Sequence, residues 1–156
     1  WVKEWGVEEG ELFSQALANV QRLEGDTIAE KMDVGEGPDV VLVQCSSIYG
    51  SAMALELERF AMAIGEYGCL VSMPVRELIV AVPISSLAFA EAIGGVISLT
   101  VHAFNEGPGA CSPKLFWYRA GTWTELPYEI NEEEKRLDFS PPDSFTDMLN
   151  EMGGEG

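Results

Sequence analysis

Residues 107–126, GPGACSPKLFWYRAGTWTEL, contain the most unusual pattern of the sequence. Two short runs, LFWY and TWTEL, are rich in aromatic and β-branched side chains, and the residues between them, Arg119-Ala120-Gly121, end in a glycine. A three-residue loop of this kind is typical of a β-hairpin that closes through a type I turn followed by a left-handed residue. It predicts that Trp117 lies opposite Trp123, as a cross-strand aromatic pair.

The same stretch places Cys111 directly after a Gly-Pro-Gly bend, which raises the alternative of a cysteine nucleophile on a loop. Such a nucleophile needs a lowered pKa and a base within reach. His102 is the sole histidine of the chain and therefore the one conventional base, but no third residue is marked by its spacing to orient it. We predict a hairpin in which Cys111 is an incidental buried thiol, and keep a small hydrolase or transferase that uses Cys111 and His102 as an alternative.

Hydrophobic periodicity predicts the remaining elements. Helical spacing occurs in residues 7–25, 51–65, 86–104 and 144–152, and apolar runs typical of strands occur in 39–45, 69–75 and 77–84, with a weaker candidate in 26–33. The first helix carries an apolar stripe made of Leu12, Phe13, Ala16, Leu17, Val20 and Leu23. Without a regular βα alternation, these elements indicate an α+β fold. We expect a mostly antiparallel sheet of five to six strands with helices packed on it, in the order α-(β)-β-α-β-β-α-β-β-α.

The length of 156 residues indicates one domain. Because the composition becomes polar after Tyr128, we assign residues 1–128 to the α+β domain and residues 129–156 to an acidic C-terminal extension. This extension is expected to hold the short helix at about 144–152 and a disordered end. The chain begins with Trp1 rather than Met, so a structural domain cut from a longer protein is a further alternative.

The charge of the chain bears on its partners. It carries 26 acidic and 9 basic side chains, a net charge of −17, whereas a small soluble domain carries a net charge of about 2–8 in magnitude. Nucleic-acid binding requires clustered Lys and Arg to neutralise phosphates, and the few bases here are scattered. Anionic membrane surfaces are disfavoured for the same reason. The charge favours a basic protein as partner.

Cysteine usage and motif content exclude several classes of site. Cys45, Cys69 and Cys111 form an odd set without a CxxC spacing, which argues against a disulfide framework and a zinc site. Free thiols indicate a reducing compartment, so we expect a cytoplasmic protein. The apolar stretch 86–104 is interrupted by a glutamate and a histidine and is predicted as a core helix rather than a membrane span. Phosphate-loop, dinucleotide and calcium-loop motifs are absent from the sequence, so neither a cofactor nor a metal is predicted.

Short motifs within residues 5–126 resemble an uncharacterised family of small bacterial proteins. The matching residues are Trp5-Gly6 with Glu11-Leu12-Phe13, then Pro74-Val75-Arg76-Glu77-Leu78, then Ser112-Pro113 through Trp123. The chain departs from the family pattern where Ala110-Cys111 precedes Ser-Pro, and in its tail. Because the family has no established activity, the resemblance implies no catalytic residue and suggests that Cys111 is incidental.

Together, these patterns favour a non-enzymatic acidic binding module, similar by analogy to a chaperone, an immunity protein or an adaptor. Arg76 and Glu77 at a strand junction, and Trp117 and Trp123 on the hairpin, are the candidate contact residues, because Trp and Arg are enriched at binding hot spots. The alternative for the two tryptophans is a place in the core. The expected partner is a basic protein, and a homodimer is compatible with the sequence.

Overall fold

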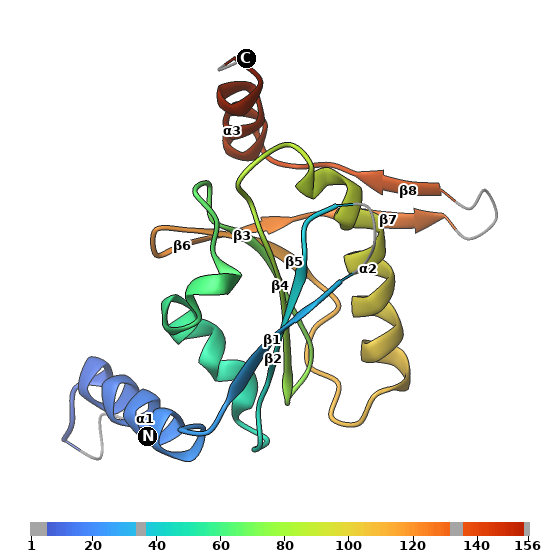
Figure 1. Cartoon of the computed structure of the whole chain (residues 1–156). Coiled ribbons are helices and arrows are strands. Elements are labelled where there is room, and N and C mark those ends of the chain that lie inside the picture. Colours follow the sequence, from blue (N-terminus) through green and yellow to red (C-terminus); the bar gives the residue numbers. More distant parts are fainter. Residues whose placement is uncertain (1–5, 34–36, 132–135, 155–156) are drawn as a thin grey trace.

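The central element is a six-stranded antiparallel sheet with the strand order β1-β2-β4-β3-β5-β6 (Figure 1). The computed structural model describes residues 6–33, 37–131 and 136–154. The strands are β1 Ile28–Met32, β2 Val40–Gln44, β3 Cys69–Val75, β4 Leu78–Pro83, β5 Leu115–Arg119 and β6 Thr122–Leu126. The predicted α+β fold with a mostly antiparallel sheet is confirmed.

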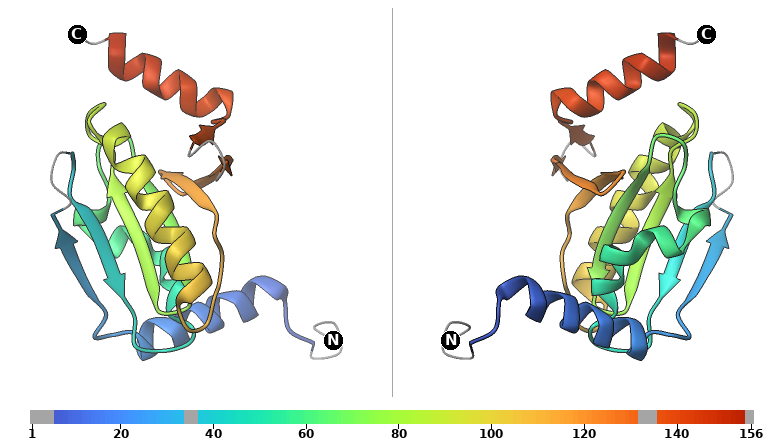
Figure 2. Two further views of the ribbon diagram at one scale, coloured as in Figure 1. Left: turned by 90° about the vertical axis from the view of Figure 1, so that its right-hand side faces the viewer. Right: turned by 90° about the vertical axis from the view of Figure 1, so that its left-hand side faces the viewer.

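Helices lie on both faces of this sheet, but they cover the two faces unequally (Figure 2). Helix α2, Phe89–Glu106, runs along one face, which we call the α2 face. The opposite face, which we call the η2 face, carries two short 3₁₀ helices, η2 Gly50–Arg59 and η3 Ala61–Ala63. Helix α1, Glu9–Leu23, passes the end of the sheet and projects beyond it.

The C-terminal residues add two elements at the other end of the sheet (Figures 1 and 2). A two-stranded hairpin, β7 Tyr128–Asn131 with β8 Arg136–Phe139, precedes helix α3, Asp143–Gly154. The sequence analysis did not predict this hairpin. Gly153 and Gly154, expected to be disordered, are the last residues of α3, and residues 155–156 lie outside the described residues.

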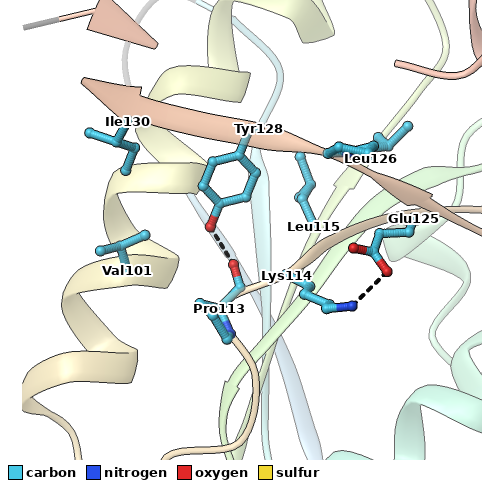
Figure 3. A pocket seen from close by; sticks show the side chains of 9 residues that line it. Val101, Pro113, Lys114, Leu115, Glu125, Leu126, Tyr128 and Ile130 are labelled. Carbon is cyan, nitrogen blue, oxygen red and sulfur yellow. Dashed lines mark hydrogen bonds and ion pairs between the residues drawn. The ribbon is translucent and has the colours of Figure 1, made fainter. Parts of the chain in front are cut away.

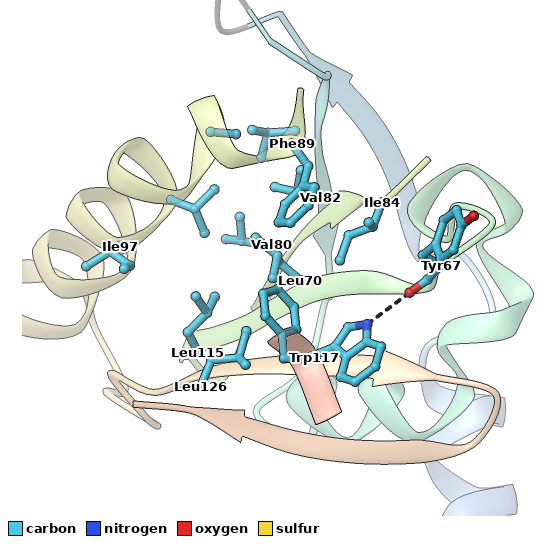
Figure 4. Packing of buried hydrophobic residues seen from close by; sticks show 14 of the residues in the cluster. Tyr67, Leu70, Val80, Val82, Ile84, Phe89, Ile97, Leu115, Trp117 and Leu126 are labelled. Carbon is cyan, nitrogen blue, oxygen red and sulfur yellow. Dashed lines mark hydrogen bonds between the residues drawn. The ribbon is translucent and has the colours of Figure 1, made fainter. Parts of the chain in front are cut away.

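The core on the α2 face draws side chains from the strands, α2 and α3 (Figure 4). Phe145 of α3 is fully buried, and its ring meets the rings of Phe89, Trp117 and Phe139 edge-on, with centroids 6.0, 5.3 and 6.2 Å away. Trp117 is 7% exposed, and its indole N–H donates to the carbonyl oxygen of Tyr67 at 2.9 Å. The segment after residue 128 therefore completes this core, while the domain boundary proposed there stays a prediction.

The two predicted central helices differ in regularity. Helix α2 is regular over 18 residues and buries five of them against the sheet. The predicted helix at 51–65 is instead made of 3₁₀ turns, with a non-helical residue at Glu56 and a break at Phe60. Its Met53 and Leu57 are still buried against the sheet. None of the helices in the described part of the chain is long and apolar enough to cross a membrane.

Candidate functional site

The β5–β6 hairpin is tighter than its sequence predicts. Strands β5 and β6 are joined by a two-residue turn, Ala120-Gly121, with φ values of 47° and 81°. Positive φ at both positions is typical of a type I′ turn, whose twist matches that of the flanking strands. The register pairs Trp123 with Tyr118 and Trp117 with Thr124. The predicted pairing of Trp117 with Trp123 is therefore wrong, and the two tryptophans lie on opposite faces of the sheet.

This register gives the two tryptophans different surroundings. Trp117 belongs to the core of the α2 face and is not accessible to a partner. Trp123 lies partly buried on the η2 face, where its ring centroid is 4.9 Å from that of Tyr118 and 6.1 Å from that of Phe116. Burial raises the pKa of Tyr118, and so does the hydrogen bond that its hydroxyl donates to Glu58 Oε1 at 2.8 Å. That hydrogen bond ties β5 to η2.

A groove of about 390 Å³ opens beside these rings, between η2 and the hairpin. It is lined by Ser51, Ala52, Ala54, Leu55, Met73, Phe116 and Trp123. Apart from one serine, these side chains are apolar, and Leu55 at the rim is 52% exposed. Concave surfaces lined by aromatic and aliphatic side chains are the usual sites at which a protein takes up an apolar group.

The turn between β3 and β4 holds the start of η2 beside this groove. Arg76 and Glu77 are both exposed, but their backbone groups are engaged. The N–H of Ser51 donates to the carbonyl of Arg76 at 2.7 Å, and the N–H of Cys45 donates to the carbonyl of Glu77 at 2.8 Å. Of the four predicted contact residues, Trp123 lines the groove and Trp117 lies on the other face of the sheet. Arg76 and Glu77 do not line the groove, but their carbonyl groups hold the chain at and before the start of η2.

The structure does not give Cys111 the surroundings of a nucleophile. Cys111 is exposed, so the prediction of a buried thiol is wrong. The chain at Cys111 runs beside the end of β3, where the N–H of Cys111 donates to the carbonyl oxygen of Pro74 at 2.8 Å. Its Sγ lies 3.9 Å from Ser51 Oγ. His102 lies exposed on α2. The thiol thus contacts a serine hydroxyl, which does not supply the base that a cysteine nucleophile needs.

The pKa values of the remaining two thiols are raised. Cys69 is fully buried, and burial raises the pKa of its thiol to about 12. Burial and the nearby charge of Glu24 raise the pKa of Cys45 to about 11. All three cysteines are free. Within residues 6–33, 37–131 and 136–154, no group of three or more His, Cys, Asp or Glu side chains could hold a metal ion.

A second hollow, of about 370 Å³, lies between α2, β5 and the chain from β6 to β7 (Figure 3). Its polar groups pair with one another. Lys114 Nζ lies 2.7 Å from Glu125 Oε2, and the hydroxyl of Tyr128 donates to the carbonyl of Pro113. Because Lys114 and Glu125 neutralise each other and the Tyr128 hydroxyl is already engaged, these groups are less available to bind a ligand. The groove beside Trp123 is the better candidate.

Sequence reasoning found Trp123 and missed the other walls of the groove. Leu55 and Met73 lie on segments far apart in the sequence, and the sheet brings them together with Phe116. The sequence did contain one signal that Leu55 is exposed. Leu55 falls between the buried positions Met53 and Leu57 and so points away from the core.

Comparisons with known proteins do not assign this chain to a family. A scan of family models, a search of curated proteins and a search of solved structures found no match. The resemblance noted from the sequence therefore stays a prediction, and the function is argued from the groove and its surroundings.

Proposed function

We propose that this protein is a non-enzymatic binding module that holds a basic partner protein through the groove between η2 and the β5–β6 hairpin. The observation that carries this proposal is the uncovered apolar lining of the groove, with Trp123 and Phe116 beside Leu55 and Met73. Aromatic residues and Met are enriched where proteins bind one another, and a few buried aromatic anchors supply most of the affinity. An apolar side chain of the partner would enter here.

The charge of the protein supports a basic partner. Its net charge is −17, and η2, which lines the groove, and α1, which packs against η2, carry more carboxylates than arginines. In α1 and η2 these are Glu9, Glu11, Glu56 and Glu58 against Arg22 and Arg59. Such a surface attracts a basic protein and repels an acidic one, and the groove then selects the apolar group. A chaperone, an immunity protein or an adaptor acts by binding another protein in this way and needs no catalysis. The free thiols support a reducing, cytoplasmic location.

The test is affinity capture from a lysate of the source cells with three baits: the wild-type chain, Leu55→Lys and Leu87→Lys. Leu55 and Leu87 are 52% and 48% exposed, so neither change disturbs the core. Both variants change the net charge equally, but Leu87 precedes α2 and does not line the groove. Leu55→Lys removes an apolar contact and adds a charge that repels a basic protein.

We expect a basic protein that the wild-type and Leu87→Lys baits retain in stoichiometric amount and that Leu55→Lys loses. It should elute as salt rises, since exposed charges are screened over about 8–10 Å at moderate ionic strength. Equal retention by both variants, or no basic protein retained at low and high salt, would contradict the proposed function.

A further inference from the structure

Helix α1 presents an apolar stripe that the described part of the chain leaves largely exposed. None of its fifteen residues is buried, and Phe13 and Leu23 are 57% and 50% exposed. Figure 2 shows the helix extending past the end of the sheet. Val20, near the C-terminal end, packs against the core of the η2 face. The apolar stripe predicted from the sequence is therefore real, but much of it lies in solvent.

A buried carboxylate fixes the C-terminal end of this helix. Glu24, fully buried, accepts hydrogen bonds from the N–H groups of Ser46 and Ser47 at 2.8 and 2.9 Å, and from Thr27 Oγ1 at 3.1 Å. The hydroxyls of Ser46 and Ser47 donate to it as well. Burial alone would raise the pKa of Glu24, but these hydrogen bonds outweigh it and hold the pKa below its usual value. The helix is thus anchored at one end, while Phe13 and Leu23 of its apolar stripe are exposed.

Helix α1 buries little of its apolar face against the described part of the chain. Isolated helices shorter than about 12–15 residues are marginal in water, and most helical stability in proteins comes from packing of the apolar face. Among residues 6–33, 37–131 and 136–154, the packing on the N-terminal half of α1 leaves its side chains exposed or only partly buried. The sequence nevertheless keeps a full stripe, from Leu12 to Leu23, on one side of the helix.

We infer that α1 is a second docking surface, on which the stripe around Phe13 binds an amphipathic helix of the partner whose polar face carries Lys and Arg. The inference rests on the proposed function, because the same basic partner would occupy the groove and α1. Both surfaces border η2: α1 packs against this helix, and Leu55 of η2 lines the groove. One partner element could therefore contact both.

Charge selects a basic helix over a second copy of this chain. Glu8, Glu9 and Glu11 surround the start of α1, within about one and a half turns of Phe13, and would meet Lys or Arg on the partner. A homodimer through α1 would bring together two chains that each carry −17.

The experiment uses the whole chain and a defined probe. The probe is a fluorescently labelled peptide of about 18 residues, or five helical turns, with Leu at helical spacing and Lys on the other face. A scrambled peptide of the same composition controls for charge alone. Fluorescence anisotropy at moderate salt gives Kd for the wild-type chain, Phe13→Lys, Leu55→Lys and the matched control Leu87→Lys. Circular dichroism confirms that each variant keeps the fold, since all three positions are exposed.

We expect the amphipathic peptide to bind at least about tenfold more tightly than the scrambled one, and Phe13→Lys to raise Kd at least about tenfold over Leu87→Lys, as loss of a hot-spot anchor does. Equal Kd values for Phe13→Lys and Leu87→Lys overturn the inference. If Leu55→Lys still weakens binding in that case, the proposed groove function survives; if it does not, both fall. Equal affinity of the two peptides also overturns the inference, as does a wild-type dimer in sedimentation that Phe13→Lys dissociates.

Discussion

The two faces of the sheet differ in how completely the chain covers them. On the α2 face, a regular helix, the β7–β8 hairpin and Phe145 of α3 close the core. Among the described residues, the η2 face and the adjoining α1 carry six of the ten large hydrophobic side chains that are exposed. These are Phe13, Leu23, Ile48, Tyr49, Leu55 and Met62. Among the described residues, the core is therefore closed more completely on one face of this sheet than on the other.

Helix geometry explains the difference. Helix α2 keeps one register over 18 residues, so its buried positions stay in line with the sheet. The ten residues of η2 form 3₁₀ turns that are interrupted at Glu56. Long runs of 3₁₀ helix are uncommon because side chains three residues apart eclipse one another. η2 therefore covers the centre of the sheet through Met53 and Leu57 and leaves the strip next to the hairpin open.

The largest effect that separates the two faces is expected from a matched pair of phenylalanine truncations. Phe145→Ala should lower the free energy of unfolding by about 3–5 kcal/mol, because it leaves a cavity among three rings. Phe13→Ala should change it by less than about 0.5 kcal/mol, because the ring is mostly exposed. Urea unfolding followed by tryptophan fluorescence measures both. Similar losses in the two variants would contradict the contrast between the faces.

An intermediate effect is expected at the anchor of α1. Glu24→Ala should cost about 1–3 kcal/mol, because the N–H groups of Ser46 and Ser47 lose their acceptor. Since the pKa of Glu24 is lowered from 4.5 in the folded protein, its contribution is complete above that value and is lost as the pH falls through the folded pKa. The difference between wild type and variant should therefore shrink on acidification.

Thermal unfolding at about pH 7 and about pH 3 measures the stability difference between the wild-type chain and Glu24→Ala. Glu30→Ala is the matched control, because Glu30 is exposed on the edge strand β1. It should change stability by less than about 0.5 kcal/mol at neutral pH. A Glu24→Ala variant that matches this control would show that the carboxylate does not hold α1.

Patterns local in the sequence predicted the fold, and contacts between distant segments limited the prediction of the site. Periodicity was sufficient for α2 and for the paired strands β3 and β4, since each signal lies within one run of residues. The β7–β8 hairpin was missed because its strands are only four residues long, so their alternation of apolar and polar residues does not stand out from the polar segment around them. The groove needs Leu55, Met73 and Phe116 together, and no pattern within one segment could reveal that.

The hairpin register was the local feature where the sequence pointed the wrong way. Arg119-Ala120-Gly121 fits a three-residue loop with glycine last, but the structure uses Ala120-Gly121 alone. Alanine rarely adopts a positive φ, so nothing marked Ala120 as a turn position. Because side chains alternate between faces, a one-residue change of register moves a tryptophan from one face to the other.

The smallest effect tests this register directly. Ala120→Asn should raise the free energy of unfolding by about 0.5–1 kcal/mol, because Asn-Gly is the preferred pair of a type I′ turn and Asn tolerates the left-handed region. Urea unfolding measures the gain, and nuclear Overhauser contacts between the rings of Tyr118 and Trp123 report the pairing. A three-residue loop would place Ala120 at negative φ and remove the gain. Destabilisation by Ala120→Asn, together with contacts between Trp117 and Trp123, would contradict this register. Both tryptophans would then lie on one face of the sheet, and the groove would lose the Trp123 wall on which the contrast between the faces depends.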